Sequence, residues 1–158
     1  MHRRTQTLRS VGSRNGARPM ASHADHIRAI LEALHRAREN FDRAAAAALL
    51  TEDVQHHMPE SFVPDPVIGR DVVAWGLTDG VARYYDPASL HREIVRTTVE
   101  NDVAVVEQRV YGRTHDGTSF HNSYVWVYEF HGDLIYRMTE HADTLLAHRA
   151  FHGAHPGR

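Results

Sequence analysis

The chain is predicted to fold as a single α+β domain, with helices packed on one face of a curved antiparallel sheet. Before Asp86-Pro87, apolar residues recur largely at helical spacing, and after it they alternate with polar ones. Helices followed by consecutive antiparallel strands are typical of the α+β class. The length of 158 residues and the apolar content of 42% suffice for one buried core.

Three helices are expected before the main strands. The first begins near Asp25. Its buried stripe consists of Ile27, Ile30, Leu31, Leu34 and Phe41. A break at residues 40–42 separates it from an alanine-rich helix that ends near Leu50. A third helix is expected to begin after Gly69 and to end before Asp86.

The strands are expected to form a sheet joined by short hairpin turns. Four of them alternate in polarity and cover residues 90–99, 103–114, 118–130 and 134–142. A shorter strand at 54–58 precedes the third helix, and three prolines keep the loop after it out of regular structure. The turns contain Asn, Asp and Gly, which favour tight hairpins.

Composition restricts the chemistry that the chain can perform. It has no cysteine, which excludes disulfides, thiolate metal ligands and a cysteine nucleophile. It also lacks a glycine-rich phosphate loop and a serine elbow motif. Any catalyst must therefore use His, a carboxylate, Tyr or Arg, and we expect neither a metal nor an organic cofactor.

Charge is distributed unevenly along the chain. The first 20 residues carry five arginines and no acid, whereas the remainder carries 13 arginines against 20 acids. An acidic body makes nucleic acid or an anionic membrane an unexpected partner. We expect residues 1–20 to be a disordered basic arm or a misassigned start, 21–147 to be the domain, and 148–158 to be a flexible tail. Without a membrane-spanning run or a signal sequence, the chain is predicted to be cytoplasmic.

Glu140 is the charged residue of the last strand that we expect to face the core, because it alternates in phase with the apolar residues of that strand. If Asp116-Gly117 is a two-residue hairpin loop, Arg109 pairs with Tyr124. If residues 131–133 form a three-residue loop, Tyr124 pairs with Glu140. The three side chains then form a row across three strands. A one-residue error in either loop would reverse the faces.

The surroundings of Glu140 favour a functional role. A carboxylate among Tyr124, Trp126 and Met138 is desolvated, which raises its pKa towards the range of a general base, while Arg109 would orient it. These three residues and Asn122, which shares their strand face, are the expected substrate-binding residues. The alternative is a structural ion pair between Glu140 and Arg109.

Four stretches carry a resemblance to a known superfamily. They are TEDVQHHMP (51–59), GRDVV (69–73), QRVY (108–111) and EHAD (140–143). Over about residues 25–146, the chain resembles the cone-shaped α+β superfamily of nuclear transport factor 2, ketosteroid isomerase and SnoaL-like polyketide cyclases. Within it, the nearest resemblance is to limonene epoxide hydrolase. This implies a cone of three N-terminal helices and a sheet around an apolar pocket, and a homodimer formed through the convex sheet face.

The resemblance also implies roles for individual residues. In the epoxide hydrolases an Asp-Arg-Asp set activates water; here Arg109 keeps the arginine and Glu140 takes the place of one aspartate. Tyr111 stands where the other aspartate is expected, and His57 stands at an asparagine. One carboxylate with His or Tyr donors is more similar to the cyclases and isomerases, which hydrogen-bond an enolate. The implied catalytic residues are Glu140, Arg109, His57 and Tyr111.

Two classes of function remain open from the sequence. The first is a cofactor-independent enzyme that uses general acid/base chemistry on a small apolar molecule, by polyketide-like cyclisation, isomerisation or epoxide hydrolysis. The second is a non-catalytic module of the same fold that binds a ligand or dimerises. They differ in one structural respect: if Trp126 and Tyr128 fill the cone so that Glu140 touches no open space, the non-catalytic function is favoured.

Overall fold

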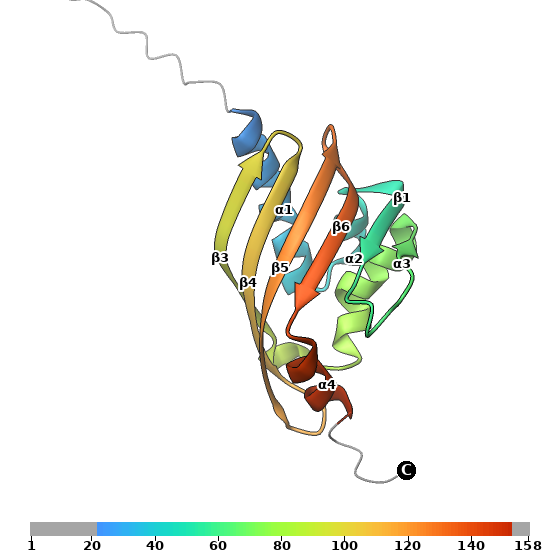
Figure 1. The fold of residues 1–158 in the computed structure, drawn as a ribbon, viewed down its shortest axis with the longest axis vertical. Coiled ribbons are helices and arrows are strands. Elements are labelled where there is room, and N and C mark those ends of the chain that lie inside the picture. Colours follow the sequence, from blue (N-terminus) through green and yellow to red (C-terminus); the bar gives the residue numbers. More distant parts are fainter. Residues whose placement is uncertain (1–21, 153–158) are drawn as a thin grey trace, which may run out of the picture.

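The computed structural model describes residues 22–152, in which three helices precede the main strands as predicted and a fourth follows them (Figure 1). The helices of this part of the chain are α1 (His23–Glu39), α2 (Arg43–Ala47), α3 (Arg70–Trp75) and α4 (Thr144–His152). The strands are β1 (Leu50–His57), β2 (Val67–Ile68), β3 (His91–Glu100), β4 (Val103–Arg113), β5 (Ser119–His131) and β6 (Leu134–Ala142). A π-helical segment, η1 (Gly76–Gly80), continues α3, and a 3-10 turn, η2 (Pro87–Ser89), precedes β3. No helix within 22–152 is long and apolar enough to span a membrane.

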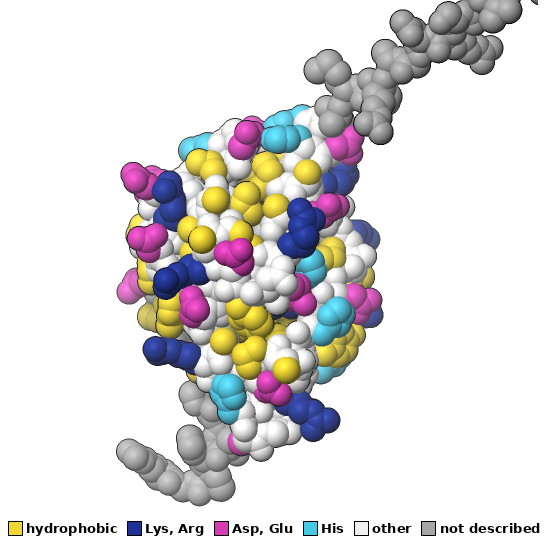
Figure 2. Space-filling view, turned by 180° about the vertical axis from the view of Figure 1, so that it is seen from behind, with side chains coloured by type: hydrophobic (Ala, Val, Ile, Leu, Met, Phe, Trp, Pro, Cys, Tyr) yellow, Lys and Arg dark blue, Asp and Glu magenta, His cyan; other side chains and the backbone are white. Residues whose placement is uncertain are grey.

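The strands form one curved sheet in the order β2-β1-β6-β5-β4-β3, with α1 and α2 behind it in the view of Figure 1 and on the near side in Figure 2. The α+β class and the curved sheet are therefore confirmed. One pairing differs from the prediction, because β1 runs parallel to β6 while the other neighbours are antiparallel. The strands of this parallel pair come from opposite ends of the domain, so no hairpin turn in the sequence indicates their direction.

Helix α1 begins with a capping box. The Ser22 hydroxyl accepts a hydrogen bond from the Asp25 amide, and the Asp25 carboxylate accepts one from the Ser22 amide. The predicted apolar residues Ile27, Ile30, Leu31 and Leu34 are buried, and Arg38 joins them near the C-terminal end of the helix. Phe41, which was predicted to belong to this stripe, lies beyond the last helical residue, Glu39, and is only partly buried. The predicted break follows, where Phe41 adopts a left-handed φ of 53°.

The two ends of the chain bear on the expected domain boundaries. Residues 148–152, which were expected to belong to a flexible tail, continue helix α4. Ala147 and Ala150 of this helix are buried against Tyr85 and Phe120, at the end of the sheet where β6 stops. The expected basic arm, residues 1–20, lies outside the described part of the chain.

The turn between β4 and β5 is one residue longer than predicted. The Thr114 amide donates to the Thr118 carbonyl at 2.9 Å, which leaves a three-residue loop with Gly117 at φ 87°. The Asp116 carboxylate accepts hydrogen bonds from the Thr114 hydroxyl and the Thr118 amide, and these bonds lower the pKa of Asp116 to about 2. As a result Arg109 pairs with Ser123, and every side chain of β4 lies on the face opposite to the predicted one.

The turn between β5 and β6 also differs from the prediction, and two deviations in the same direction together shift the register by two residues, which restores the predicted face. His131 pairs with Leu134 around the two-residue loop Gly132-Asp133, and a bulge follows between Glu129 and Phe130. Each deviation moves the register by one residue. Glu140 therefore pairs with Trp126 and keeps the predicted face.

Candidate functional site

The site begins with a carboxylate and an imidazole on adjacent central strands. The parallel pairing of β1 with β6 places His56 opposite Met138, next to Glu140 on the same face. The His56 Nε2 atom lies 3.3 Å from the Glu140 Oε2 atom, with 7% and 15% of the two side chains exposed. The geometry of this contact is not that of a hydrogen bond, and His56 Nε2 has no hydrogen-bond partner within the described part of the chain. Two acid/base groups thus meet in the interior.

Trp126 forms the floor beneath this pair. It lies opposite Glu140 on β5, and its ring stacks on His56 with 5.4 Å between centroids. On the other side Trp126 stacks on Tyr128, at 5.8 Å, and the Arg38 guanidinium lies 4.6 Å from the indole centroid. Arg38 thereby makes a cation–π contact with the same ring that supports His56.

Two phenols lie close enough to Glu140 for its charge to affect their ionisation. Burial is the main cause that raises the pKa of Tyr85 and of Tyr124 well above the ordinary value, and the charge of Glu140 adds to it. An interaction between the two hydroxyls also contributes to the pKa of each phenol. Both phenols therefore stay neutral at neutral pH.

A buried arginine from β3 anchors the end of α1. The Arg92 Nη1 atom donates to the Glu39 carboxylate at 2.9 Å and to the Arg38 carbonyl at 3.3 Å. Burial lowers the pKa of Arg92 to about 10, and Glu39 opposes this shift. Arg92 therefore stays charged at neutral pH and holds Arg38 in place through the helix backbone.

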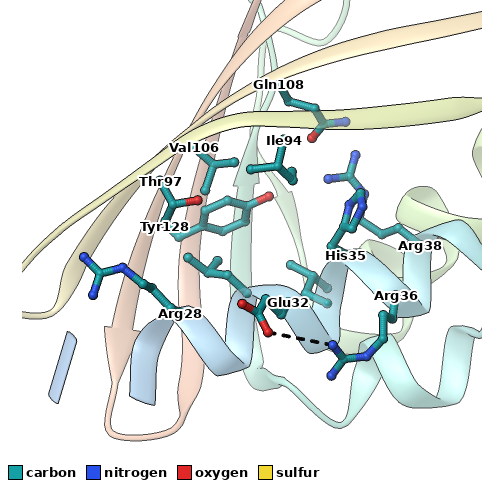
Figure 3. A pocket seen from close by; sticks show the side chains of 12 residues that line it. Arg28, Glu32, His35, Arg36, Arg38, Ile94, Thr97, Val106, Gln108 and Tyr128 are labelled. Atoms are coloured by element: carbon teal, nitrogen blue, oxygen red, sulfur yellow. Dashed lines mark ion pairs between the residues drawn. The ribbon is translucent and has the colours of Figure 1, made fainter. Parts of the chain in front are cut away.

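A pocket of about 440 Å³ opens beside this interior, between α1 and strands β3 to β5 (Figure 3). Arg38, Gln108 and Tyr128 line it, together with residues of α1 and β3, whereas His56 and Glu140 do not. Two buried, stacked rings connect the pocket with Glu140: Tyr128 lines the pocket, and Trp126 lies opposite Glu140 on β5. The pocket and the acid/base pair are thus neighbouring but separate features.

His35 on the pocket wall gives the stability of the domain a pH dependence. Burial is the main cause that lowers the pKa of His35; Glu39 opposes it, and Arg38, Arg92 and His91 reinforce it. The folded protein therefore takes up this proton less readily than the unfolded chain, whose pKa is near 6.5. The contribution of neutral His35 to the free energy of unfolding is therefore present above that pH and is lost on acidification.

We expect the free energy of unfolding, measured by urea denaturation, to fall between pH 7 and 5 by more in the wild type than in His35→Gln. Equal slopes for the two proteins would contradict this expectation.

The structure does not bring all the predicted catalytic residues together. Arg109 and Tyr111 lie on the convex face, so the predicted row with Glu140 was wrong, for the register reason given above. Arg109 is half-exposed, 3.9 Å from Glu93, and Tyr111 stacks on His121 at 4.8 Å. His57 lies on the strand face opposite to His56, with its Nε2 atom 3.3 Å from the Gln55 side-chain oxygen.

The four residues predicted to bind substrate lie on the interior face, in different environments. Trp126 and Met138 are buried, and Tyr124 is partly buried near Glu140. The Asn122 side chain is fully buried, donates to the Asp143 carbonyl at 2.9 Å and accepts from the Ser123 and Asp143 amides. Its hydrogen-bonding capacity is largely used in joining β5 to the start of α4.

Sequence reasoning missed several interior polar residues. For two of them the sequence contained a signal: His56 alternates with the buried Val54, and Arg38 follows Leu31 and Leu34 on the apolar stripe of α1. Gln108 is different, because its face depended on the length of the β4–β5 turn. Within residues 22–152, no three His, Asp or Glu side chains lie close enough together to hold a metal ion.

The architecture and the polar interior define an NTF2-like α+β cone. A family model for the SnoaL-like domain matches residues 27–138, so the chain belongs to the SnoaL-like domain family. A comparison with curated proteins finds no match. The narrower resemblance to limonene epoxide hydrolase stays a prediction.

Solved structures support the fold. An NTF2-like protein from Burkholderia pseudomallei has a TM-score of 0.71 at 18% identity, covering 80% of this chain and 98% of its own. TsrD from Streptomyces laurentii has a TM-score of 0.67 at 18% identity, with coverage of 84% and 98%. TerC, co-crystallised with polyporic acid, has a TM-score of 0.68 at 18% identity, with coverage of 80% and 97%. At these identities the likeness is one of fold.

Proposed function

We propose that the chain is a cofactor-independent enzyme of the isomerase or cyclase type, acting on a small apolar molecule with an enolisable carbonyl group. The observation that carries this proposal is the contact between Glu140 and His56 in the domain interior, beside neutral phenols. Membership of the SnoaL-like family supports it, because polyketide cyclases belong to that family. Enolate chemistry needs a carboxylate as the base and neutral hydrogen-bond donors that stabilise the enolate oxygen.

In the proposed reaction Glu140 removes the proton from the carbon next to the carbonyl. The electron pair of that C–H bond forms the enolate, and the proton stays on the carboxylate. Tyr124 donates a hydrogen bond to the enolate oxygen, and donors of this kind are worth about 3 kcal/mol in other enzymes. Return of the proton to a different carbon gives an isomer. Attack of the enolate carbon on a second carbonyl closes a ring, and Glu140 then protonates the new alkoxide.

Epoxide hydrolysis has less support. The Asp-Arg-Asp arrangement of the enzymes that the chain resembles would need Arg109 and Tyr111 next to Glu140. Both side chains lie on the convex face. We therefore rank epoxides behind enolisable ketones as substrates.

A non-catalytic ligand-binding module is the second candidate. It is favoured by one observation, namely that the pocket beside α1 is not lined by Glu140 and is separated from it by buried aromatic rings. Against it, the Glu140 side chain keeps 15% of its surface exposed, so the carboxylate is not completely enclosed by the core. In addition, burying a carboxylate and an imidazole whose hydrogen-bonding atoms lack partners is unfavourable if the two groups only fill the core.

The experiment that separates the two is a turnover assay. We expect the purified protein to exchange deuterium into, isomerise or cyclise at least one member of a panel of apolar enolisable ketones and diketones. Epoxides of similar size serve as the comparison panel, and proton NMR detects each product. Absence of turnover across both panels, with a folded protein, would favour the binding module.

A further inference from the structure

We propose that the pocket between α1 and strands β3 to β5 is a binding site for a small carboxylic acid with an apolar body. The pocket has a volume of about 440 Å³, within the usual range for small-molecule sites. Because Glu140 and His56 do not line it, this inference does not depend on the proposed chemistry.

Three nitrogen atoms on the pocket wall lack hydrogen-bond partners. They are Nε2 of Gln108, Nε of Arg38 and Nδ1 of His35, and none has a partner in the described part of the chain. Gln108 is 2% exposed and Arg38 is 6% exposed. In Figure 3 the Gln108 amide, on the sheet side, points towards the part of the pocket where Arg38 and His35 rise from α1. Buried donors without partners are destabilising, and an oxygen acceptor in the pocket would satisfy them.

Charge indicates that this acceptor is an anion. Arg28 and Arg36 at the rim already face Asp25 and Glu32, at 3.2 and 4.0 Å. Arg38 lies deeper and has no ion pair among residues 22–152; its guanidinium lies over the Trp126 ring and interacts with the Tyr128 hydroxyl. A buried cation without a counter-ion is unfavourable. A carboxylate would supply the missing charge and accept from Arg38 and Gln108 together.

The rest of the pocket fits an apolar body. The lining residues that provide this surface are Leu31, Leu34, Ile94, Val106 and Tyr128. In Figure 3 the sheet residues Val106 and Ile94 form one wall, and α1 forms the other. A neutral His35 can carry its hydrogen on Nδ1 and add a third donor to the carboxylate end. A short aromatic acid therefore matches both ends of the pocket.

The test uses the full chain with 3-phenylpropanoate as the probe and the uncharged 3-phenylpropanamide as its isostere. We expect isothermal titration calorimetry to give a dissociation constant at least about tenfold lower for the acid, since a charged hydrogen bond exceeds a neutral one by about that factor. Binding should also change the fluorescence of Trp126, which contacts Arg38.

Matched variants identify the site. Gln108→Leu keeps the size of the buried side chain and should weaken the acid about tenfold or more, whereas the exposed Gln55→Leu should not. Arg38→Met should abolish the preference for acid over amide, whereas Arg109→Met on the convex face should keep it. If Arg38→Met fails to fold, Gln108→Leu and the filling variant Val106→Phe carry the test.

Two outcomes would overturn the site. In the first, the acid binds no more tightly than the amide. In the second, Gln108→Leu and Val106→Phe bind the acid as tightly as the wild type does. Glu140→Gln should bind the acid normally, so loss of the carboxylate site and loss of the proposed catalysis are distinguishable.

Discussion

Glu140→Gln is expected to lower turnover of a confirmed ketone substrate by about two orders of magnitude or more. Glutamine keeps the size of the side chain and its place beside His56 and Trp126, but it cannot accept the proton from carbon. The Michaelis constant should change little, because the amide still fills the space of the carboxylate. Steady-state kinetics on the folded variant measure both quantities.

Two further variants show whether the effect is specific. Glu93→Gln removes an exposed carboxylate of the convex face and should leave turnover unchanged. His56→Gln should lower turnover less than Glu140→Gln, and the double variant should be no worse than Glu140→Gln alone, because His56 contributes only through its contact with Glu140. Full turnover in Glu140→Gln would make the carboxylate a structural partner of His56 and end the proposed mechanism.

Trp126→Ala is expected to reduce the free energy of unfolding by about 3–5 kcal/mol, the range for truncating a buried aromatic side chain. The ring contacts His56 and Tyr128 by stacking and supports the Arg38 guanidinium. Its removal leaves a cavity and also takes away the only aromatic face that Arg38 contacts in the described structure. Chemical denaturation with a fitted midpoint and slope gives the value.

The neighbouring position provides the control. Val125→Ala, on the convex face, should cost less than about 1 kcal/mol, as surface substitutions usually do. Trp126→Phe keeps a ring and should lie between the two. A cost below about 1 kcal/mol for Trp126→Ala would mean that the interior repacks easily, and the ordered floor of the site would be in doubt.

Most of the fold could be predicted from the sequence, because the elements that were predicted carry local signals. The stripe of α1, its end at Asn40 and the alternation of β3 to β6 all depend on residues close together in the chain. The pairing of β1 with β6 carries no such signal, because only the packing of the whole domain brings these strands together.

The site could be predicted less well than the fold, because it depends on which face of the sheet each side chain occupies. Because the turn after Thr114 has three residues, Arg109 faces outwards and Gln108 faces inwards. Glu140 kept its predicted face because a shorter loop and a bulge near Phe130 each shift the register by one residue, and a total shift of two residues preserves the face. The choice of His57 over His56 came from a resemblance to other enzymes, and the alternation of β1 alone would have favoured His56.

The parallel pairing of β1 with β6 has a consequence for how the acid/base pair comes into existence during folding. His56 and Glu140 meet only after the chain between them has closed a long loop, whose entropic cost is offset when the central strands pair. Such long-range pairing is slow compared with the formation of local hairpins. No partly folded fragment that lacks either strand can contain the pair, so catalytic competence and cooperative unfolding should be gained and lost in the same transition.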